Sequence, residues 1–163
     1  MHCWALPSWK RLANRTNGDP ALKRIRVLIA DPDRCLVASY RDFLSRTGID
    51  VVTATNGLEC VAALRAFATD VVVLEPELLW GRGEDVLAMM CDQVDVPMVP
   101  VIILSTCKNA QTLDALPAFP ICDHGTKPLS PEQLADRICK LVLYHRVGDS
   151  LSKEAKAYGM QAV

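Results

Sequence analysis

Short apolar runs alternate with longer amphipathic stretches along the central part of the chain. The runs are four to six residues long, are rich in valine, isoleucine and leucine, and cover residues 25–30, 49–54, 71–74, 101–104 and 118–122. Runs of this length predict strands, and the most apolar of them predict strands buried on both faces of a parallel sheet. Their alternation with helices predicts an α/β fold.

Helical periodicity fills most intervals between these runs. The first helix ends near Gly48, the second begins at the cap Asn56, a third follows the loop 79–83, and the last begins at Pro131 behind the cap Ser130. The residues expected to share a helix face are Leu36, Tyr40, Phe43 and Leu44, then Cys60, Leu64 and Phe67, then Leu87, Met90, Cys91 and Val94, and finally Leu134, Ile138, Leu141 and Val142.

We expect one domain, over residues 24–147, between two terminal segments. The chain has 163 residues, of which 50% are hydrophobic and 23% charged, and this suits a single core. Residues 1–23 mix tryptophan and proline with basic residues and predict a flexible basic arm, either a loose tail or a contact for an acidic partner or lipid surface. Residues 148–163 are expected to be a short tail, and residues 109–116 are too poor in apolar positions to predict a helix with any weight.

Charge and apolar content narrow the class of protein. The net charge of −1 provides no electrostatic footprint for nucleic acid. No apolar run is long enough to span a membrane, and Pro7 interrupts the apolar start before it could act as a signal-peptide core. We therefore expect a cytoplasmic protein without nucleic-acid or membrane partners.

The cysteines show no metal or disulfide pattern. All seven are scattered, without a Cys-x-x-Cys motif, at Cys3, Cys35, Cys60, Cys91, Cys107, Cys122 and Cys139. We interpret them as small hydrophobic side chains in a reducing compartment rather than as metal ligands or disulfides.

Polar side chains follow the ends of four predicted strands. Asp31 and Asp33 follow the first, Glu75 the third and Ser105 the fourth, and Lys127 lies after the fifth. Because the carboxyl ends of parallel strands meet at one edge of a sheet, these side chains should converge. We expect an ion pair between Lys127 and Glu75, since a partly buried carboxylate without a partner is costly.

This constellation resembles the receiver domains of two-component response regulators, over about residues 24–146. In that family an acidic pair ends the first strand, a phosphoacceptor aspartate ends the third, a serine or threonine ends the fourth, and a lysine followed by proline comes after the fifth. The spacings of 44 positions from Asp31 to Glu75, 30 from Glu75 to Ser105 and 22 from Ser105 to Lys127 are similar to those of receivers. The resemblance implies a flavodoxin-like, doubly wound, five-stranded parallel sheet of order 2-1-3-4-5, with helices on both faces.

Two departures from the family pattern affect the phosphorylation chemistry. Glu75 stands at the phosphoacceptor position, and Pro32 replaces the second acid of the pair, which in the family is a direct Mg²⁺ ligand. Mg²⁺ requires a near-octahedral set of oxygens, so this loss weakens the site, although Asp33 could partly compensate. We expect the Mg²⁺ site of Asp31, Asp33 and Glu75 to be weak or lost, and we expect no other cofactor.

The length of the Glu75 side chain has two consequences. The extra methylene displaces the nucleophile by roughly 1.5 Å, and an error of about 1 Å can lower a rate a hundredfold, so phosphotransfer should be slow or absent. The same methylene carries a negative charge toward the place of the phosphoryl group. With Lys127 as ion-pair partner and Ser105 as hydrogen-bond donor, Glu75 could imitate the activated state. The competing interpretation is a pocket carboxylate with no signalling consequence.

Two further site residues have a plain alternative. His124 lies three positions before Lys127, where receivers carry the aromatic switch residue, or it is simply a half-exposed side chain at a strand end. Ser105 is the strand-four hydroxyl of the family pattern, or a satisfied hydroxyl without a role. A metal role for His124 is not expected.

Three classes of function are open at this point. The first is a stand-alone, degenerate receiver in phosphorelay signal transduction that is not an enzyme and binds a histidine kinase, a phosphotransfer protein or another regulator, with homodimerisation left open. The second is a phosphorylatable receiver that uses Glu75, Asp31 or Asp33. The third is a flavodoxin-like enzyme, which the absence of glycines after the first strand disfavours. The expected contact surface includes the outward face of the last helix, which is either bound or merely solvated: Glu132, Gln133, Asp136, Arg137 and Lys140.

Overall fold

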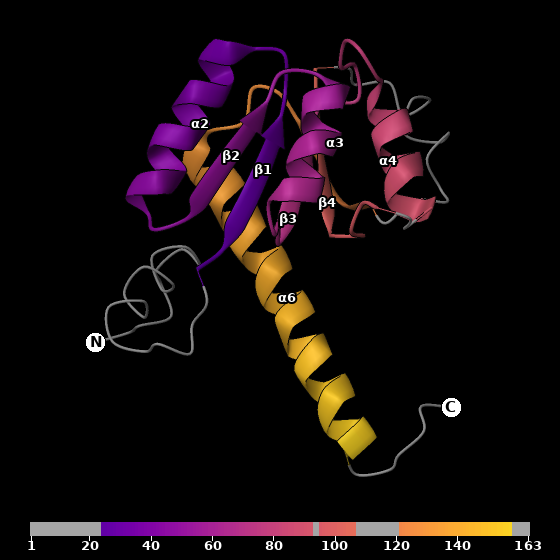
Figure 1. Cartoon of the computed structure of the whole chain (residues 1–163). Coiled ribbons are helices and arrows are strands. Elements are labelled where there is room, and N and C mark those ends of the chain that lie inside the picture. The colour runs from indigo at the N-terminus through magenta and orange to yellow at the C-terminus, as the bar shows by residue number, and fades with distance from the viewer. Residues whose placement is uncertain (1–23, 93–94, 107–120, 158–163) are drawn as a thin grey trace, which may run out of the picture.

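Five strands form one parallel sheet in the computed structural model, which describes residues 24–92, 95–106 and 121–157, with side chains through Arg146 except that of Ile121. The strand order is β2-β1-β3-β4-β5, and every pairing is parallel (Figure 1). The strands are β1 Arg26–Ala30, β2 Asp50–Ala54, β3 Val71–Leu74, β4 Val101–Ser105 and β5 Ile121–Thr126. This order confirms the expected flavodoxin-like, doubly wound architecture.

Helices cover both faces of the sheet. The helices α2 (Arg34–Arg46) and α6 (Pro131–Ala157) pack on one face, and α3 (Gly57–Ala66) and α4 (Gly83–Asp92) pack on the other. Each face has its own hydrophobic core, with the three central strands between them. The sheet is therefore the middle layer of three.

The third strand shows why a central strand of this sheet is apolar at every position. All four residues of β3 are buried, because Val71 and Val73 face α2 and α6 while Val72 and Leu74 face α3 and α4. A strand covered on both faces has no solvent side and so reads as a continuous apolar run. Full burial of each such side chain contributes about 1.5–3 kcal/mol.

Side-chain caps begin three of the helices. Asp33 Oδ1 accepts hydrogen bonds from the backbone N–H groups of Cys35 and Leu36, both at 3.0 Å, and begins α2. Asn56 caps α3 through the N–H of Glu59 at 2.9 Å, and Ser130 caps α6 through the N–H of Gln133 at 3.2 Å. The predicted caps Asn56 and Ser130 are confirmed, whereas the capping role of Asp33 was not expected.

The prediction for the fifth strand needs correction. In the part of the chain that the structure describes, β5 begins at Ile121 and ends at Thr126, four residues beyond the predicted end at 122. It is an edge strand, and its exposed residues Cys122 and His124 alternate with the half-buried Asp123 and Gly125. An edge strand of this kind lacks the apolar run that marks a central strand. The prediction from the apolar patch at 118–122 therefore gave the strand the wrong bounds.

The predicted boundary at residue 147 falls inside a helix. The 27 residues of α6 continue to Ala157, and the C-terminal part of the helix extends away from the three layers (Figure 1). No proline follows Pro131 in this stretch, and its last turns are rich in alanine, lysine and glutamate, which favour helix. The described residues thus show helix where a tail was expected to begin, at 148, and the domain boundary at 147 stays a prediction. The expectations for residues 1–23, Val94, 109–116 and 118–120 lie outside the described residues.

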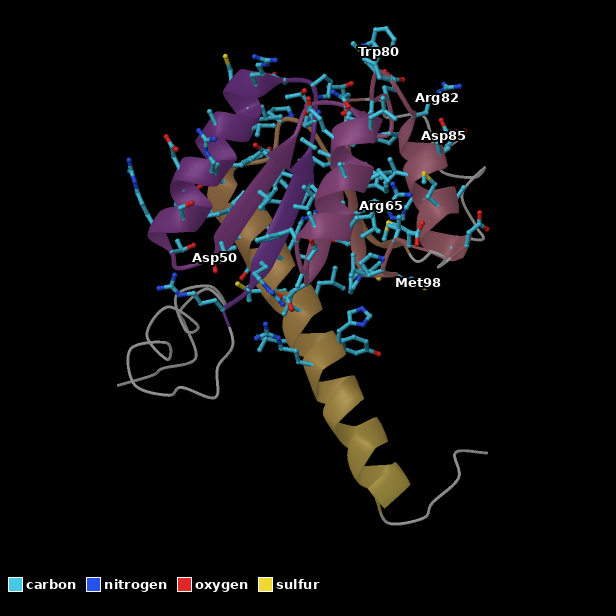
Figure 2. All side chains as sticks on the ribbon, in the orientation of Figure 1. Asp50, Arg65, Trp80, Arg82, Asp85 and Met98 are labelled. Atoms are coloured by element: carbon cyan, nitrogen blue, oxygen red, sulfur yellow. The ribbon has the colours of Figure 1, made fainter. Side chains whose placement is uncertain are left out.

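The loop between β3 and α4 packs tightly against the start of α3. The N–H groups of Gly57 and Leu58 donate 3.1 Å hydrogen bonds to the carbonyls of Leu79 and Trp80. A Cβ at Gly57 would lie 2.0 Å from the Gly81 carbonyl oxygen, so only glycine permits this approach. Trp80 has a φ of 52°, is 75% exposed and points away from the body at the tip of the loop (Figure 2).

Candidate functional site

The four strand-end positions meet at the carboxyl edge of the sheet, as predicted. Backbone hydrogen bonds place them: the N–H of Glu75 donates to the Ala30 carbonyl at 2.9 Å, and the N–H of Lys127 donates to the Ser105 carbonyl at 2.8 Å. Asp31 follows β1 directly and is held by the Ala54 carbonyl at 3.0 Å. Neighbouring parallel strands therefore deliver two acids, a hydroxyl and a lysine to one place.

Lys127 bridges two buried carboxylates. Its Nζ lies 2.6 Å from Glu75 Oε2 and 2.5 Å from Asp31 Oδ2. The exposed fractions of the three side chains are 11% for Lys127, 5% for Glu75 and 4% for Asp31. The expected ion pair with Glu75 is confirmed, and the second pair with Asp31 was not predicted.

The carboxylate oxygens that do not contact Lys127 accept backbone hydrogen bonds. Asp31 Oδ1 accepts from the N–H of Asp33 at 2.9 Å, and Glu75 Oε1 accepts from the N–H of Glu77 at 3.3 Å. All four oxygens of the two carboxylates thus have a donor from the protein itself. This satisfies the requirement that buried charges be both paired and hydrogen-bonded.

The lysine in this network keeps its charge. Burial by itself would lower the pKa of Lys127, but the hydrogen bonds and negative charges of Asp31 and Glu75 outweigh it, and the pKa is raised above its ordinary 10.5. Lys127 is therefore an ammonium at neutral pH. With both carboxylates ionised, the formal charge of the three groups is −1.

The donor set does not fit Mg²⁺. Asp33 is exposed and uses its carboxylate to cap α2, Pro32 has no ligand atom, and the Lys127 ammonium contacts both Asp31 and Glu75. A cation already occupies the position between the carboxylates that a divalent ion would need. Among residues 24–92, 95–106 and 121–157, no group of three or more aspartate, glutamate, histidine or cysteine side chains is arranged to hold a metal.

Ser105 and His124 differ in their surroundings. Ser105 is buried at the end of β4, and its backbone carbonyl fixes the N–H of Lys127. The hydrogen bond from its hydroxyl to Glu75 stays a prediction. His124 lies within β5 rather than at its end, is exposed, and its carbonyl accepts a 2.7 Å hydrogen bond from Arg137.

Arg137, which was expected on the outward face of the last helix, instead forms structural contacts with β5. Its NH1 lies 2.9 Å from both carboxylate oxygens of Asp123 as well as binding the His124 carbonyl, and so it fastens α6 to β5. Lys140 on the same helix pairs with Asp136 at 2.6 Å. A charge reversal at Arg137 would therefore alter the β5–α6 contact as well as any partner surface.

Tyr40 is the other residue whose role was missed. It was expected only on the apolar face of α2, yet its hydroxyl donates a 2.8 Å hydrogen bond to the Leu129 carbonyl, two residues after Lys127. Burial and the charge of Asp31 raise its pKa to about 12. The one signal in the sequence was a hydroxyl on an otherwise apolar helix face, which requires a partner when buried.

Comparison with known proteins identifies the family. The model of the response regulator receiver domain matches residues 27–139. The chain is 32% identical over 113 residues to the alginate biosynthesis transcriptional regulatory protein AlgB of Pseudomonas aeruginosa, a match that covers 69% of this chain and 24% of that protein. It is 30% identical over 128 residues to the probable transcriptional regulatory protein TcrX of Mycobacterium tuberculosis, covering 78% of this chain and 52% of that protein. The chain thus spans between a quarter and a half of the length of these relatives.

Solved structures show the same fold. The receiver domain of a putative LuxO repressor protein from Vibrio parahaemolyticus matches with a TM-score of 0.70 and 21% identity, over 79% of this chain and 98% of that one. The receiver domain of the Francisella response regulator 1452 matches with a TM-score of 0.65 and 25% identity, over 75% and 99%. None of the described helices is long and apolar enough to cross a membrane. The chain therefore belongs to the response regulator receiver domain family of two-component signalling, as its strand order, its strand-end residues and these matches together show.

Proposed function

We propose that this receiver domain signals without being phosphorylated, with Glu75 as a permanent substitute for the phosphorylated aspartate. One observation carries the proposal: Lys127 is already bound, 2.6 Å from Glu75 and 2.5 Å from Asp31, in a network whose carboxylate oxygens all have donors. A network complete in itself needs neither metal nor phosphoryl group to be stable. The negative charge of Glu75 thereby forms an ion pair with the same lysine that a phosphoryl group would attract.

The geometry also disfavours phosphotransfer. The Glu75 carboxylate is one methylene farther from the backbone than an aspartate, and a displacement of about 1 Å is enough to lower the rate of a positioned attack a hundredfold. Pro32 removes a metal ligand, and Asp33, the acid that could compensate, caps α2. Attack by Asp31 would require its carboxylate to leave both Lys127 and the N–H of Asp33.

We infer that the output of such a domain is binding to other signalling proteins. Membership in the receiver family supports partners such as a histidine kinase, a phosphotransfer protein or another regulator, and self-association is a further candidate. These two relatives are named as transcriptional regulatory proteins, but the match covers only about a quarter of the length of one and about half of the other. It therefore provides no argument for direct contact between this chain and nucleic acid.

Intact-protein mass spectrometry after incubation with a small-molecule phosphodonor and Mg²⁺ tests the absence of phosphorylation. We expect no mass increase of one phosphoryl group. An adduct that maps to Glu75, Asp31 or Asp33 would instead support the phosphorylatable receiver.

Hydrogen exchange distinguishes the activated-state substitute from a plain pocket carboxylate. Glu75→Gln removes the charge at nearly constant shape, and we expect it to raise amide exchange around Ser105 and Lys127 as well as beside position 75. Glu77→Gln, two positions along and exposed, is the matched control and should leave exchange there unchanged. Changes confined to the neighbours of Glu75 would favour the plain carboxylate.

A further inference from the structure

A groove between β5 and α6 lies outside the Asp31–Glu75–Lys127 network. Its volume is about 890 Å³, and its lining residues come from β5, from the segment after Lys127 and from four turns of α6. None of the three network residues lines it. The groove is therefore a separate candidate for chemistry.

A thiol and an imidazole meet in this groove. Cys122 Sγ on β5 lies 3.7 Å from His145 Nε2 on α6, within hydrogen-bond distance for sulfur, and both side chains are exposed. The thiolate is the reactive form of cysteine, and histidine is the side chain best suited to take up its proton near neutral pH. An exposed cysteine within reach of a base is the arrangement that thiol nucleophiles require.

The surrounding contacts hold the two groups in place. Arg137 binds Asp123 and the His124 carbonyl, the two residues that follow Cys122, and so fixes this part of β5 against α6. The Tyr144 ring packs edge-on against the His145 ring, with the ring centroids 5.9 Å apart and an angle of 87° between the planes. The Cys122–His145 distance thus depends on defined packing.

The rest of the groove can hold a small molecule beside the thiol. Its charged side chains form ion pairs with one another, Asp123 with Arg137 and Asp136 with Lys140. Leu129, Leu141 and Tyr144 add apolar and aromatic surface. Such a mixture suits a flexible ligand with both polar and apolar parts.

We propose that Cys122 is a thiol modification site that reacts with low-molecular-weight disulfides, with His145 as its general base. The Cys122 thiol transfers its proton to His145, and the thiolate sulfur attacks one sulfur of the disulfide. The disulfide bond breaks, a mixed disulfide forms on Cys122, and the departing thiolate takes the proton from His145 to leave as a thiol. Cys122 is oxidised and one half of the disulfide is reduced, so no other oxidant is needed.

The other described cysteines differ from Cys122 in ways that make the site selective. Cys60 and Cys139 are buried, and burial raises the pKa of both thiols to about 12. Cys91 is half-buried, and Cys35 is exposed near the start of α2. Cys35 is therefore the internal reference for an exposed thiol outside the groove.

Reaction with glutathione disulfide at neutral pH, followed by peptide mapping, tests the proposal on the full chain. We expect a mixed disulfide at Cys122 that a thiol reductant reverses and that forms about tenfold faster than the one at Cys35. An ordinary cysteine is already a few per cent thiolate at that pH, and this fraction sets the upper limit of the rate advantage that a base can give. His145→Gln should remove this advantage and leave the Cys35 rate unchanged. Lys140→Gln, which removes a positive charge from the lining of the same groove, should lower the Cys122 rate less than His145→Gln does.

Several outcomes would overturn the assignment. Equal rates at Cys122 in the wild type and in His145→Gln, with the fold intact by circular dichroism, would remove the role of His145. A Lys140→Gln rate as low as that of His145→Gln would assign the effect to local charge. Failure to form any adduct at Cys122, while Cys35 reacts, would show that the groove does not admit the disulfide.

Discussion

The Tyr40 hydroxyl donates a 2.8 Å hydrogen bond to the Leu129 carbonyl, and this bond ties α2 to the segment that carries Lys127. Lys127 lies two residues earlier and bridges Asp31 and Glu75. The helix that Asp33 caps and the lysine that bridges the two carboxylates are thereby coupled through one side chain.

Replacing Tyr40 with phenylalanine should lower the free energy of unfolding. The change keeps the ring but leaves the part-buried Leu129 carbonyl without this donor, and the loss of such a hydrogen bond costs about 1–2 kcal/mol. Urea unfolding measures it. Tyr144→Phe, at a tyrosine that is 78% exposed, is the control and should be neutral. Equal effects of the two variants would show that the Tyr40 bond contributes nothing specific.

Loss of Lys127 should destabilise the fold more than loss of the Glu75 charge. Lys127→Met leaves two buried carboxylates without their cation, and this should lower the free energy of unfolding by about 3–5 kcal/mol. Glu75→Gln leaves Lys127 paired with Asp31 and should cost about 1–2 kcal/mol. Urea unfolding at neutral pH ranks the two, with Lys140→Met, whose side chain is 70% exposed, as a near-neutral control. The reverse ranking would contradict a bridging role for Lys127.

Stability should fall steeply in alkaline solution. The pKa of Cys60 and of Cys139 rises from 9.0 to about 12, and that of Tyr40 from 10.0 to about 12, in each case mainly through burial. Between these values the folded chain keeps protons that the unfolded chain has lost. The free energy of unfolding therefore decreases as pH rises, by up to about 1.4 kcal/mol per pH unit for each group.

Urea unfolding under reducing conditions, between about pH 8 and about pH 11, measures this dependence. Lys127 adds to it at the upper end of this range, because its pKa is raised in the folded chain: its stabilisation is fully present below 10.5 and is lost as the pH rises from there through the raised pKa. Cys60→Ala should flatten the slope, whereas Cys35→Ala, at an exposed site, should leave it unchanged. If Cys60→Ala leaves the slope of the free energy of unfolding against pH unchanged, the assignment of this slope to buried thiols is refuted.

Gly57 should tolerate a side chain less well than Gly48. A methyl group at Gly57 would press on the Gly81 carbonyl at 2.0 Å, and relieving an overpacked contact with backbone typically costs about 1–3 kcal/mol. Gly48 has a φ of 84° but open space around it, so alanine there adds only a conformational strain of about 1–2 kcal/mol. Thermal unfolding of Gly57→Ala and Gly48→Ala compares them, and we expect Gly57→Ala also to increase proteolysis of the loop that carries Trp80.

Restoring the family acids should restore phosphorylation. The double variant Pro32→Asp with Glu75→Asp supplies the missing metal ligand and shortens the nucleophile, so we expect Mg²⁺-dependent labelling by a small-molecule phosphodonor. Glu75→Asp alone keeps Pro32 and should label far more weakly. A folded double variant that takes up no phosphoryl group would mean that the arrangement of Ser105 and Lys127 has also departed from that of an active receiver.

The amino-acid sequence by itself determined the elements whose signals are local. A strand covered on both faces must be apolar throughout, as β3 is, and a helix start needs an acceptor such as Asn56 or Ser130 within three residues. The convergence of Asp31, Glu75, Ser105 and Lys127 also followed, because each lies at or just after the carboxyl end of a parallel strand. The half-exposed edge strand β5 has no such apolar run, and its bounds were misplaced.

Only the tertiary structure decided which partners these side chains take. Strand order and register place Lys127 within reach of both Asp31 and Glu75, while Asp33 turns to cap α2 instead of joining them. Tyr40 and Leu129, 89 positions apart, and Cys122 and His145, 23 apart, meet for the same reason. A residue's neighbours in sequence set its conformation, but its distant contacts depend on how helices and strands pack, which no local pattern contains.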